Sequence, residues 1–202
     1  MWKTVKLGNV ANWYRGLTYS KKDEVMNNGL GVLRATNIDL ATHNIVLDDI
    51  RLISKSVKVQ VEKYAQVGDL LICTASGSKS HVGKIALIKE DLGMAFGGFM
   101  AVIRCYETCI PAFLYQVMTS RNFKYHLNSL SDGANINNLK FSQIESFEFP
   151  IPPLEEQKQI VKKLDAINLK KDSSINALNS QIDNYIALKL SILSNSLKSP
   201  AL

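Results

Sequence analysis

The side chains with the widest chemical range lie in a polar loop of sequence TASGSKSHVGK, at residues 74–84. Hydroxyl and lysine ammonium groups donate hydrogen bonds to phosphate, and histidine and serine can also reach the edges of bases. Gly77 and Gly83 let the backbone approach a ligand closely. An ordinary solvated hairpin would have the same composition, so both interpretations stay open. If the loop binds nucleic acid, its candidate contact residues are Ser76, Ser78, Lys79, Ser80, His81 and Lys84.

Three more polar clusters, at residues 16–22, 34–37 and 133–140, offer similar chemistry. Arg34 is a bidentate donor suited to guanine or phosphate, and Asn37 carries an amide of the kind that pairs with adenine. Arg34 also lies in an apolar run, which makes a structural salt bridge the alternative. Each cluster is a weak signal alone, but four such loops on one scaffold favour nucleic-acid binding. The candidate contact residues here are Thr18, Tyr19, Ser20, Lys21, Lys22, Arg34, Thr36, Asn37, Asn135, Asn137 and Lys140.

The sequence contains none of the catalytic motifs that these residue types could serve. It has no Gly-x-Ser-x-Gly elbow, no Gly-x-x-x-x-Gly-Lys-Ser/Thr phosphate loop and no His-Glu-x-x-His helix. It also lacks a glycine-rich methyl-donor loop and an Asn-Pro-Pro-Tyr motif. The paired acids at 48–49 and 155–156 are typical of solvated or helix-capping charges. We therefore expect a binding module with no cofactor, not an enzyme.

The cysteine count and the hydropathy of the sequence indicate the compartment in which the protein works. Cys73, Cys105 and Cys109 are an odd number of thiols without an export signal, which argues against a disulfide framework. We expect buried or idle thiols and no metal, with zinc ligands that converge in space as the alternative. No apolar run reaches the roughly 20 residues of a membrane span, and the N-terminus has no signal-peptide core. These features predict a cytoplasmic protein without membrane contact.

The composition supports a packed, mildly basic domain. Apolar residues make up 46% of the 202 residues, and the net charge is +6, which permits a polyanionic partner without requiring one. Short apolar runs bounded by Gly, Asn, Asp and Ser predict strands, and Ile110–Arg121 predicts a helix with an apolar face. We expect an α+β fold, with a strand-rich mixed α/β domain over residues 1–152. The predicted strands fall in the segments 31–38, 68–74, 83–88 and 99–104.

A stiff connection and one long helix follow this domain. Three prolines within Pro150–Pro153 predict extended chain, and Glu155 and Glu156 suit the first turn of a helix. Residues 154–197 contain neither Pro nor Gly, and a helix of that length would reach roughly 60 Å. Its apolar positions keep a coiled-coil spacing that needs another helix as partner. These seam positions include Val161, Leu164, Ile175, Leu178, Ile182, Tyr185 and Ile192.

Two alternatives to this long helix stay open at the level of the sequence. The helix could fold back over its own domain and bury its apolar seam there. It could also break within the stretch Asp172-Ser-Ser-Ile175 and form two shorter helices. Either arrangement would remove the need for a partner helix.

A series of motifs resembles specificity (S) subunits of type I restriction–modification enzymes. The stretch FPIPPLEEQKQIVKKLDAI (149–167) resembles the boundary between a target recognition domain and a conserved helix of that family. Other segments resemble the recognition domain itself, in the same order along the chain. These segments are WKTVKLG (2–8), VLRATNI (32–38), GDLLICTASGS (68–78), VGKIALI (82–88), FGGFMAVIR (96–104), FLYQVMTS (113–120) and INNLKFSQIESFEFPIPPLEEQ (136–157).

The resemblance implies a non-catalytic subunit that reads DNA and holds other subunits. In the family, methyltransferase (M) subunits modify adenine, and added restriction (R) subunits cleave. Family members usually carry two recognition domains and two antiparallel helices, which together read two half-sites separated by a fixed gap. The resemblance thus implies double-stranded DNA, M subunits and possibly R subunits as partners.

The sequence departs from the family pattern because it has one recognition domain and one helix. We expect a recognition domain over 1–152, and a helix over 153–202 that sets spacing, pairs with a second copy and docks M subunits. Antiparallel helices of a homodimer would then present two identical, inverted half-site readers. The alternatives are a fragment that partners a different half, and a coiled-coil interaction module that acts as a decoy or regulator without reading DNA.

Overall fold

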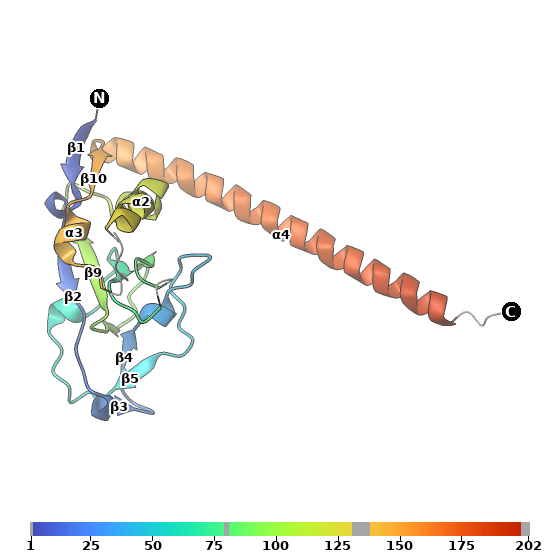
Figure 1. Ribbon diagram of the computed structural model, residues 1–202, viewed down its shortest axis with the longest axis horizontal. Coiled ribbons are helices and arrows are strands. Elements are labelled where there is room, and N and C mark those ends of the chain that lie inside the picture. Colours follow the sequence, from blue (N-terminus) through green and yellow to red (C-terminus); the bar gives the residue numbers. More distant parts are fainter. Residues whose placement is uncertain (1, 79–80, 131–137, 199–202) are drawn as a thin grey trace. The chain divides into compact units, whose positions relative to one another are not determined.

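The computed structural model describes residues 2–78, 81–130 and 138–198, with side chains described as far as Ser194 (Figure 1). The chain divides into two compact units, one ending at Lys158 and one beginning at Gln159. The first is a mixed, strand-rich domain and the second is helical, which confirms the predicted fold class.

Within the described residues, the strands are short and fall into three sheets. Strands β2, β9, β6 and β7 form an antiparallel sheet in that order, and β3, β5, β4 and β8 form another in which β4 and β8 are parallel. Strands β1 and β10 form an antiparallel ribbon. The strands are β1 (Lys3–Lys6), β2 (Ala11–Arg15), β3 (Glu24–Val25), β4 (Leu30–Leu33), β5 (Arg51–Ile53), β6 (Leu70–Cys73), β7 (Ile85–Leu87), β8 (Ala95–Phe96), β9 (Met100–Cys105) and β10 (Glu148–Ile151).

The core forms where the most apolar runs of the sequence pair with each other. Every residue of β6 is buried, as are Met100–Ile103 of β9 beside it, so both strands read as continuous apolar runs. The predicted strands at 68–74, 83–88 and 99–104 are confirmed by β6, β7 and β9. The run at 31–38 is a strand only as far as Leu33, because a 3₁₀ turn occupies Ala35–Asn37.

Three short helices accompany the sheets. Helix α1 (Pro111–Thr119) confirms the predicted helix, with Pro111 in its first turn and Phe113, Leu114 and Met118 buried against the sheet. Helices α2 (Arg121–Ser129) and α3 (Phe141–Glu145) were not predicted. Ser120 separates α1 from α2 and caps α2 by accepting a hydrogen bond from the backbone N–H of Phe123.

The proline-rich connection is the strand β10, whose Pro150 lies opposite Thr4 of β1. Proline is tolerated here because a two-stranded ribbon leaves one side of each strand unpaired. Helix α4 (Leu154–Lys198) begins directly after Pro152 and Pro153, with Glu155 and Glu156 in its first turn as predicted. The connection is therefore extended, as its prolines require, and is also held by a neighbouring strand.

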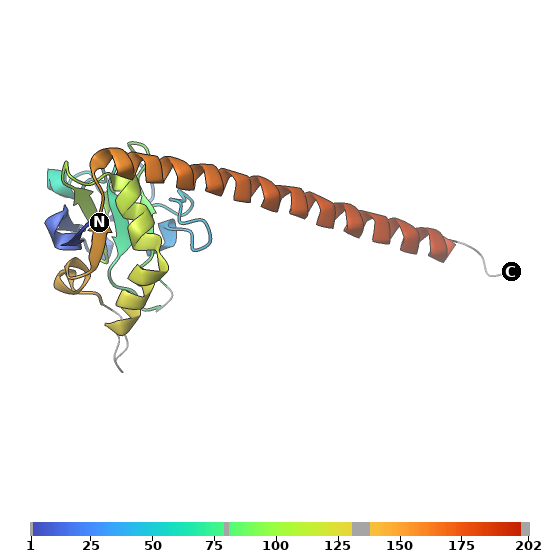
Figure 2. The same ribbon diagram turned by 90° about the horizontal axis from the view of Figure 1, so that it is seen from above.

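Helix α4 runs for 45 residues without a break (Figures 1 and 2). The alternative of two helices divided near Asp172-Ser-Ser-Ile175 is therefore wrong. Ser174 keeps its hydroxyl within the helix by donating to the Lys170 carbonyl oxygen at 2.9 Å. Apolar seam residues are solvent-exposed, with Leu178, Ile182 and Tyr185 at 58%, 54% and 71%. Within the described part of the chain, no helix is both long enough and apolar enough to cross a membrane.

Candidate nucleic-acid interface

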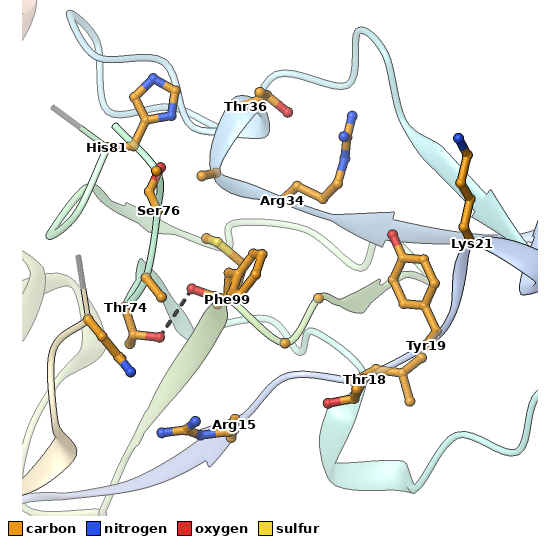
Figure 3. Close-up of a pocket in the computed structure, with 18 of the residues that line it drawn as sticks. Arg15, Thr18, Tyr19, Lys21, Arg34, Thr36, Thr74, Ser76, His81 and Phe99 are labelled. Carbon is orange, nitrogen blue, oxygen red and sulfur yellow. Dashed lines mark hydrogen bonds between the residues drawn. The ribbon is translucent and has the colours of Figure 1, made fainter. Parts of the chain in front are cut away.

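The strand-rich domain carries a pocket of about 690 Å³ (Figure 3). It forms where the end of β2, the turn after β4, the loop after β6 and the turn before β9 come together. Predicted clusters that are far apart in sequence therefore meet at one place. Asn138 adds part of the cluster at 133–140 to the same pocket. The predicted residues that line it are Thr18, Tyr19, Lys21, Arg34, Thr36, Ser76 and His81.

Closely packed backbone forms one wall of the pocket. Leu17 donates a backbone hydrogen bond to the Phe96 oxygen at 2.7 Å, and Gly16 donates to the Met100 oxygen at 2.9 Å. A Cβ atom on Gly16 would lie 2.0 Å from the Gly97 oxygen, so only glycine allows this approach. The chain on either side of Gly16 is thereby fixed, which positions Arg15 and Thr18 at the pocket.

Arg34 is held in the pocket wall by Asp49. Its Nη2 atom donates to both the side-chain Oδ2 and the backbone oxygen of Asp49, each at 3.0 Å. Asp49 adopts a left-handed backbone conformation, with φ at 54°, which turns its carbonyl and carboxylate toward the same donor. The structural salt bridge that the sequence left open is therefore present. It leaves the Nε atom, which is buried, without a hydrogen-bond partner among the described residues, so the donor group that remains for a ligand is Nη1.

Phe99 places an aromatic ring in the middle of the pocket (Figure 3). The ring is 71% exposed, which is unusual for phenylalanine. Its backbone oxygen accepts hydrogen bonds from the N–H groups of Thr74 and Ala75 and from the Thr74 hydroxyl, at 2.9, 3.1 and 3.1 Å. A fixed backbone beneath an exposed ring is well suited to stacking on a base or contacting a thymine methyl group.

The pocket is predominantly cationic. Arg15, Lys21 and Arg34 line it together with one acid, Glu24, whose carboxylate is paired with Arg51 at 3.4 Å. Partial burial, and to a smaller extent Glu24, raise the pKa of the Tyr19 phenol, which is therefore a neutral hydrogen-bonding group at physiological pH. Cations with hydroxyl and aromatic groups between them suit an anionic polymer that carries bases.

Ser76, Ser78 and His81 are connected by local hydrogen bonds. Ser76 accepts a hydrogen bond from the N–H of Ser78 at 3.1 Å, and His81 donates its N–H to the Ser78 oxygen at 3.1 Å. Desolvation, helped by the charge of nearby Lys84, lowers the pKa of the His81 imidazole. His81 is therefore neutral at pH 7 and offers hydrogen bonds without a positive charge.

Two predicted contact residues have structural roles instead. Asn37 is fully buried, and its amide donates to the carbonyl oxygens of Val46 and Asp48 while its oxygen accepts from the Arg34 N–H. Lys84 is 8% exposed, and its ammonium group donates to the Ile38 oxygen at 3.1 Å. Both side chains satisfy backbone groups of the 35–48 segment, and these contacts leave them without a place in the proposed DNA interface.

The remaining predicted contact residues lie outside the pocket lining or outside the described residues. Ser20 and Asp23 close the 3₁₀ turn that carries Lys21 and Lys22, with the Ser20 N–H donating to Asp23 at 2.7 Å. Lys22 and Ser78 are exposed near the pocket, and Lys140 is exposed at the start of α3. The predicted residues outside the described part of the chain are Lys79, Ser80, Asn135 and Asn137.

Arg15, Glu24 and Phe99 were not predicted, but all three line the pocket. For two of them a signal was available in the sequence, because Arg15 directly precedes Gly16 and Phe99 directly follows Gly97-Gly98. Glycine next to a large polar or aromatic residue marks a close backbone approach that presents the neighbouring side chain.

The three cysteines differ in their exposure. Cys73 and Cys109 are buried and Cys105 is half-buried, and all three are free. Burial raises the pKa of the Cys73 thiol to about 11, which leaves it protonated at neutral pH. Across residues 2–78, 81–130 and 138–198, no three His, Cys, Asp or Glu side chains are grouped so that they could hold a metal ion.

The sequence of this chain is similar to those of a known protein family. Residues 1–184 match the family model described as "Type I restriction modification DNA specificity domain". The chain is 34% identical over 180 residues to the type I restriction enzyme StySPI specificity subunit of Salmonella potsdam, and equally to the EcoKI specificity subunit of Escherichia coli K12. Each match covers 86% of this chain but 37% of the relative, so the chain spans well under half the length of these relatives.

Solved structures show the same fold at lower sequence identity. A chain from a type I restriction–modification system, studied for its complex assembly and conformational transition, superimposes with a TM-score of 0.73 at 21% identity. That match covers 96% of this chain and 45% of the other. The HsdS subunit from Thermoanaerobacter tengcongensis gives a TM-score of 0.61 at 20% identity, covering 84% of this chain and 37% of the other.

Proposed function

Because this chain belongs to the family of type I restriction–modification DNA specificity domains, we propose that it reads one half of a gapped DNA site on behalf of partner subunits. In this proposal the chain carries no catalytic group. It places methyltransferase subunits that modify adenine, and it serves restriction subunits where cleavage accompanies methylation. Its partners are double-stranded DNA and those subunits.

The observation that carries the DNA-reading role is the composition of the pocket in the strand-rich domain. Arg15 and Lys21 supply charges for phosphates, while Arg34 and Phe99 supply directional and apolar contacts for bases. Phosphate contacts position a protein on DNA, and base contacts give it specificity. A single concave surface with both kinds of group supports sequence-specific binding better than a purely electrostatic surface would.

We propose that α4 pairs with an antiparallel copy of itself. The exposed residues Ile175, Leu178, Ile182 and Ile192 follow a coiled-coil spacing, and burying them requires another helix. A twofold dimer makes the two recognition domains equivalent, so its site consists of two identical, inverted half-sites. The lengths of the relatives, which exceed twice that of the matched segment, support the presence of a second half in the assembly.

A second candidate function is a coiled-coil interaction module that regulates a restriction–modification complex without reading DNA. The exposed apolar stripe of α4 supports partner binding whether or not the domain binds DNA. The two functions differ in one measurable property, which is the salt-sensitive affinity of the chain for duplex DNA.

The test of DNA binding is the Lys21→Ala variant, measured by fluorescence anisotropy on specific and unrelated duplexes over a salt series. Lys21 is exposed and lines the pocket, so its loss should weaken binding to every sequence by a similar factor. The slope of log affinity against log salt should fall in magnitude by roughly 1, because one phosphate contact is lost.

Lys6→Ala is the matched control, because Lys6 is an exposed lysine of β1 that does not line the pocket. The control should keep the wild-type salt slope. Equal slopes for the wild-type chain and both variants would remove Lys21 from the interface. Absence of any salt-sensitive duplex binding by the wild-type chain would favour the interaction module.

A further inference from the structure

One polar side chain in the first turn of α4 is buried, whereas its neighbours are exposed. Gln157 is fully buried, with 0% of its surface exposed, whereas Glu155, Glu156, Lys158 and Gln159 are all exposed. Glutamine is seldom buried unless its amide is hydrogen-bonded. The position of Gln157, four residues after the last proline of the connection, makes it the first residue of α4 to enter the domain interior.

The Gln157 amide joins three segments of the first unit. Its Oε1 atom accepts a hydrogen bond from the Ile110 N–H at 2.8 Å. Its Nε2 atom donates to the Pro152 oxygen at 2.9 Å and to the Thr108 oxygen at 3.1 Å. The start of α4, the end of β10 and the turn between β9 and α1 are therefore tied together by one side chain.

A second contact holds the same helical turn from outside. The Trp2 indole N–H donates to the Glu156 carboxylate at 2.9 Å, and Trp2 directly precedes β1, the strand that pairs with β10. The helix turn is thus tied to both strands of the β1–β10 ribbon. Both contacts lie within the unit that ends at Lys158.

The stability gained by burying a side chain does not explain why residue 157 is a glutamine. A methionine or leucine would bury comparable volume, and apolar burial has no direction. A buried amide with three hydrogen bonds accepts one orientation, because rotation would leave donors and acceptors unpaired. Gln157 therefore contributes angular precision at the beginning of α4, which packing would not supply.

Because α4 is long, a small change in the direction of its first turn produces a large displacement at its far end. At ~1.5 Å per residue, a rotation of roughly 10° in the first turn moves a point 60 Å along the helix by about 10 Å. One base pair changes the separation of two half-sites by about 3.4 Å along the duplex and rotates them by about 35°. If the first turn of α4 could rotate by this amount, the helix could not hold two half-site readers at one fixed separation.

We propose that Gln157 is a positioning residue that fixes the gap length between the two half-sites. This inference rests on the proposed function, because it requires a bipartite site. Gln157 touches no base and no reacting atom in this account. It acts by holding the first turn of α4 in one orientation on the recognition domain.

The test measures methyl transfer by the complete complex of this chain with its methyltransferase subunits. The substrates are duplexes that carry the wild-type half-sites with the native gap, or with that gap changed by one or two base pairs. Gln157→Met should lower the preference for the native gap over its neighbours by about tenfold, while discrimination between bases within each half-site stays unchanged. Gln159→Met, the same substitution at an exposed position two residues later, should keep the wild-type gap preference.

Trp2→Phe provides a second variant at the exposed contact, where a folding defect is not expected. We expect it to lower the gap preference by about threefold, and it decides the matter if Gln157→Met methylates no substrate. Unchanged gap preference in Gln157→Met, or in Trp2→Phe when Gln157→Met is inactive, would overturn the inference. A wild-type complex that methylates all gaps equally, or none, would instead contradict the proposed function on which it rests.

Discussion

Replacing both Leu178 and Ile182 with aspartate is expected to separate the α4 dimer into monomers and to abolish site-specific methylation. Both side chains are more than half exposed in the single chain, and both belong to the proposed seam. Burying a large aliphatic side chain contributes about 1.5–3 kcal/mol, so the four residues of a symmetric dimer contribute roughly 6–12 kcal/mol. The dissociation constant should therefore rise by more than about a thousandfold.

The measurement is sedimentation equilibrium or light scattering across a concentration series, followed by methylation with the partner subunits present. Ser180→Asp with Asn184→Asp is the matched control, because these exposed residues lie on the opposite face of α4 and gain the same charge. The control should remain dimeric. A Leu178→Asp, Ile182→Asp protein that is as dimeric as wild type would contradict the proposed pairing.

Arg34→Ala is expected to lower the discrimination between the specific duplex and an unrelated one. An arginine that makes a bidentate contact with a guanine contributes about 1–3 kcal/mol of discrimination, which corresponds to a loss of roughly 5- to 150-fold in specific affinity. Asp49 already accepts two hydrogen bonds from Nη2, so Nη1 has to supply the base contact, and the lower part of this range is expected.

Arg34→Lys separates charge from shape at the same position. Lysine keeps the positive charge but lacks the planar fork, so it should recover non-specific affinity and leave specificity impaired. Anisotropy titrations with specific and unrelated duplexes give both quantities, and thermal unfolding monitors the loss of the Asp49 contact. If Arg34→Lys kept full specificity, Arg34 would act only as a point charge and would not read a base.

The elements that the sequence predicted best depend on local rules. Proline near a helix start, acids in the first turn and a long stretch without Pro or Gly predict α4 with few competing structures. The continuous apolar runs of β6 and β9 likewise predicted buried strands. Helix α2 escaped prediction because it is short and mostly polar, with Phe123 as its one buried residue.

The candidate site was predicted in outline but not in the role of each residue. Polar loops far apart in sequence do meet in one pocket, yet whether a side chain faces that pocket is decided by tertiary contacts. The side chains of Asn37 and Lys84 are buried because they donate hydrogen bonds to the carbonyl oxygens of Val46, Asp48 and Ile38. No local sequence pattern indicates these contacts. Phe99 went unnoticed because its apolar run suggested a core strand, whereas its ring is exposed.

Methylation mapping of DNA from cells that express this chain with its methyltransferase subunits would test DNA reading and the symmetric dimer together. We predict a single adenine motif composed of two identical, inverted half-sites separated by a fixed gap. A gapped motif with two different half-sites would contradict the symmetric dimer and require a second, distinct recognition domain. Absence of any motif, with the chain folded and bound to its methyltransferase, would contradict the DNA-reading role itself.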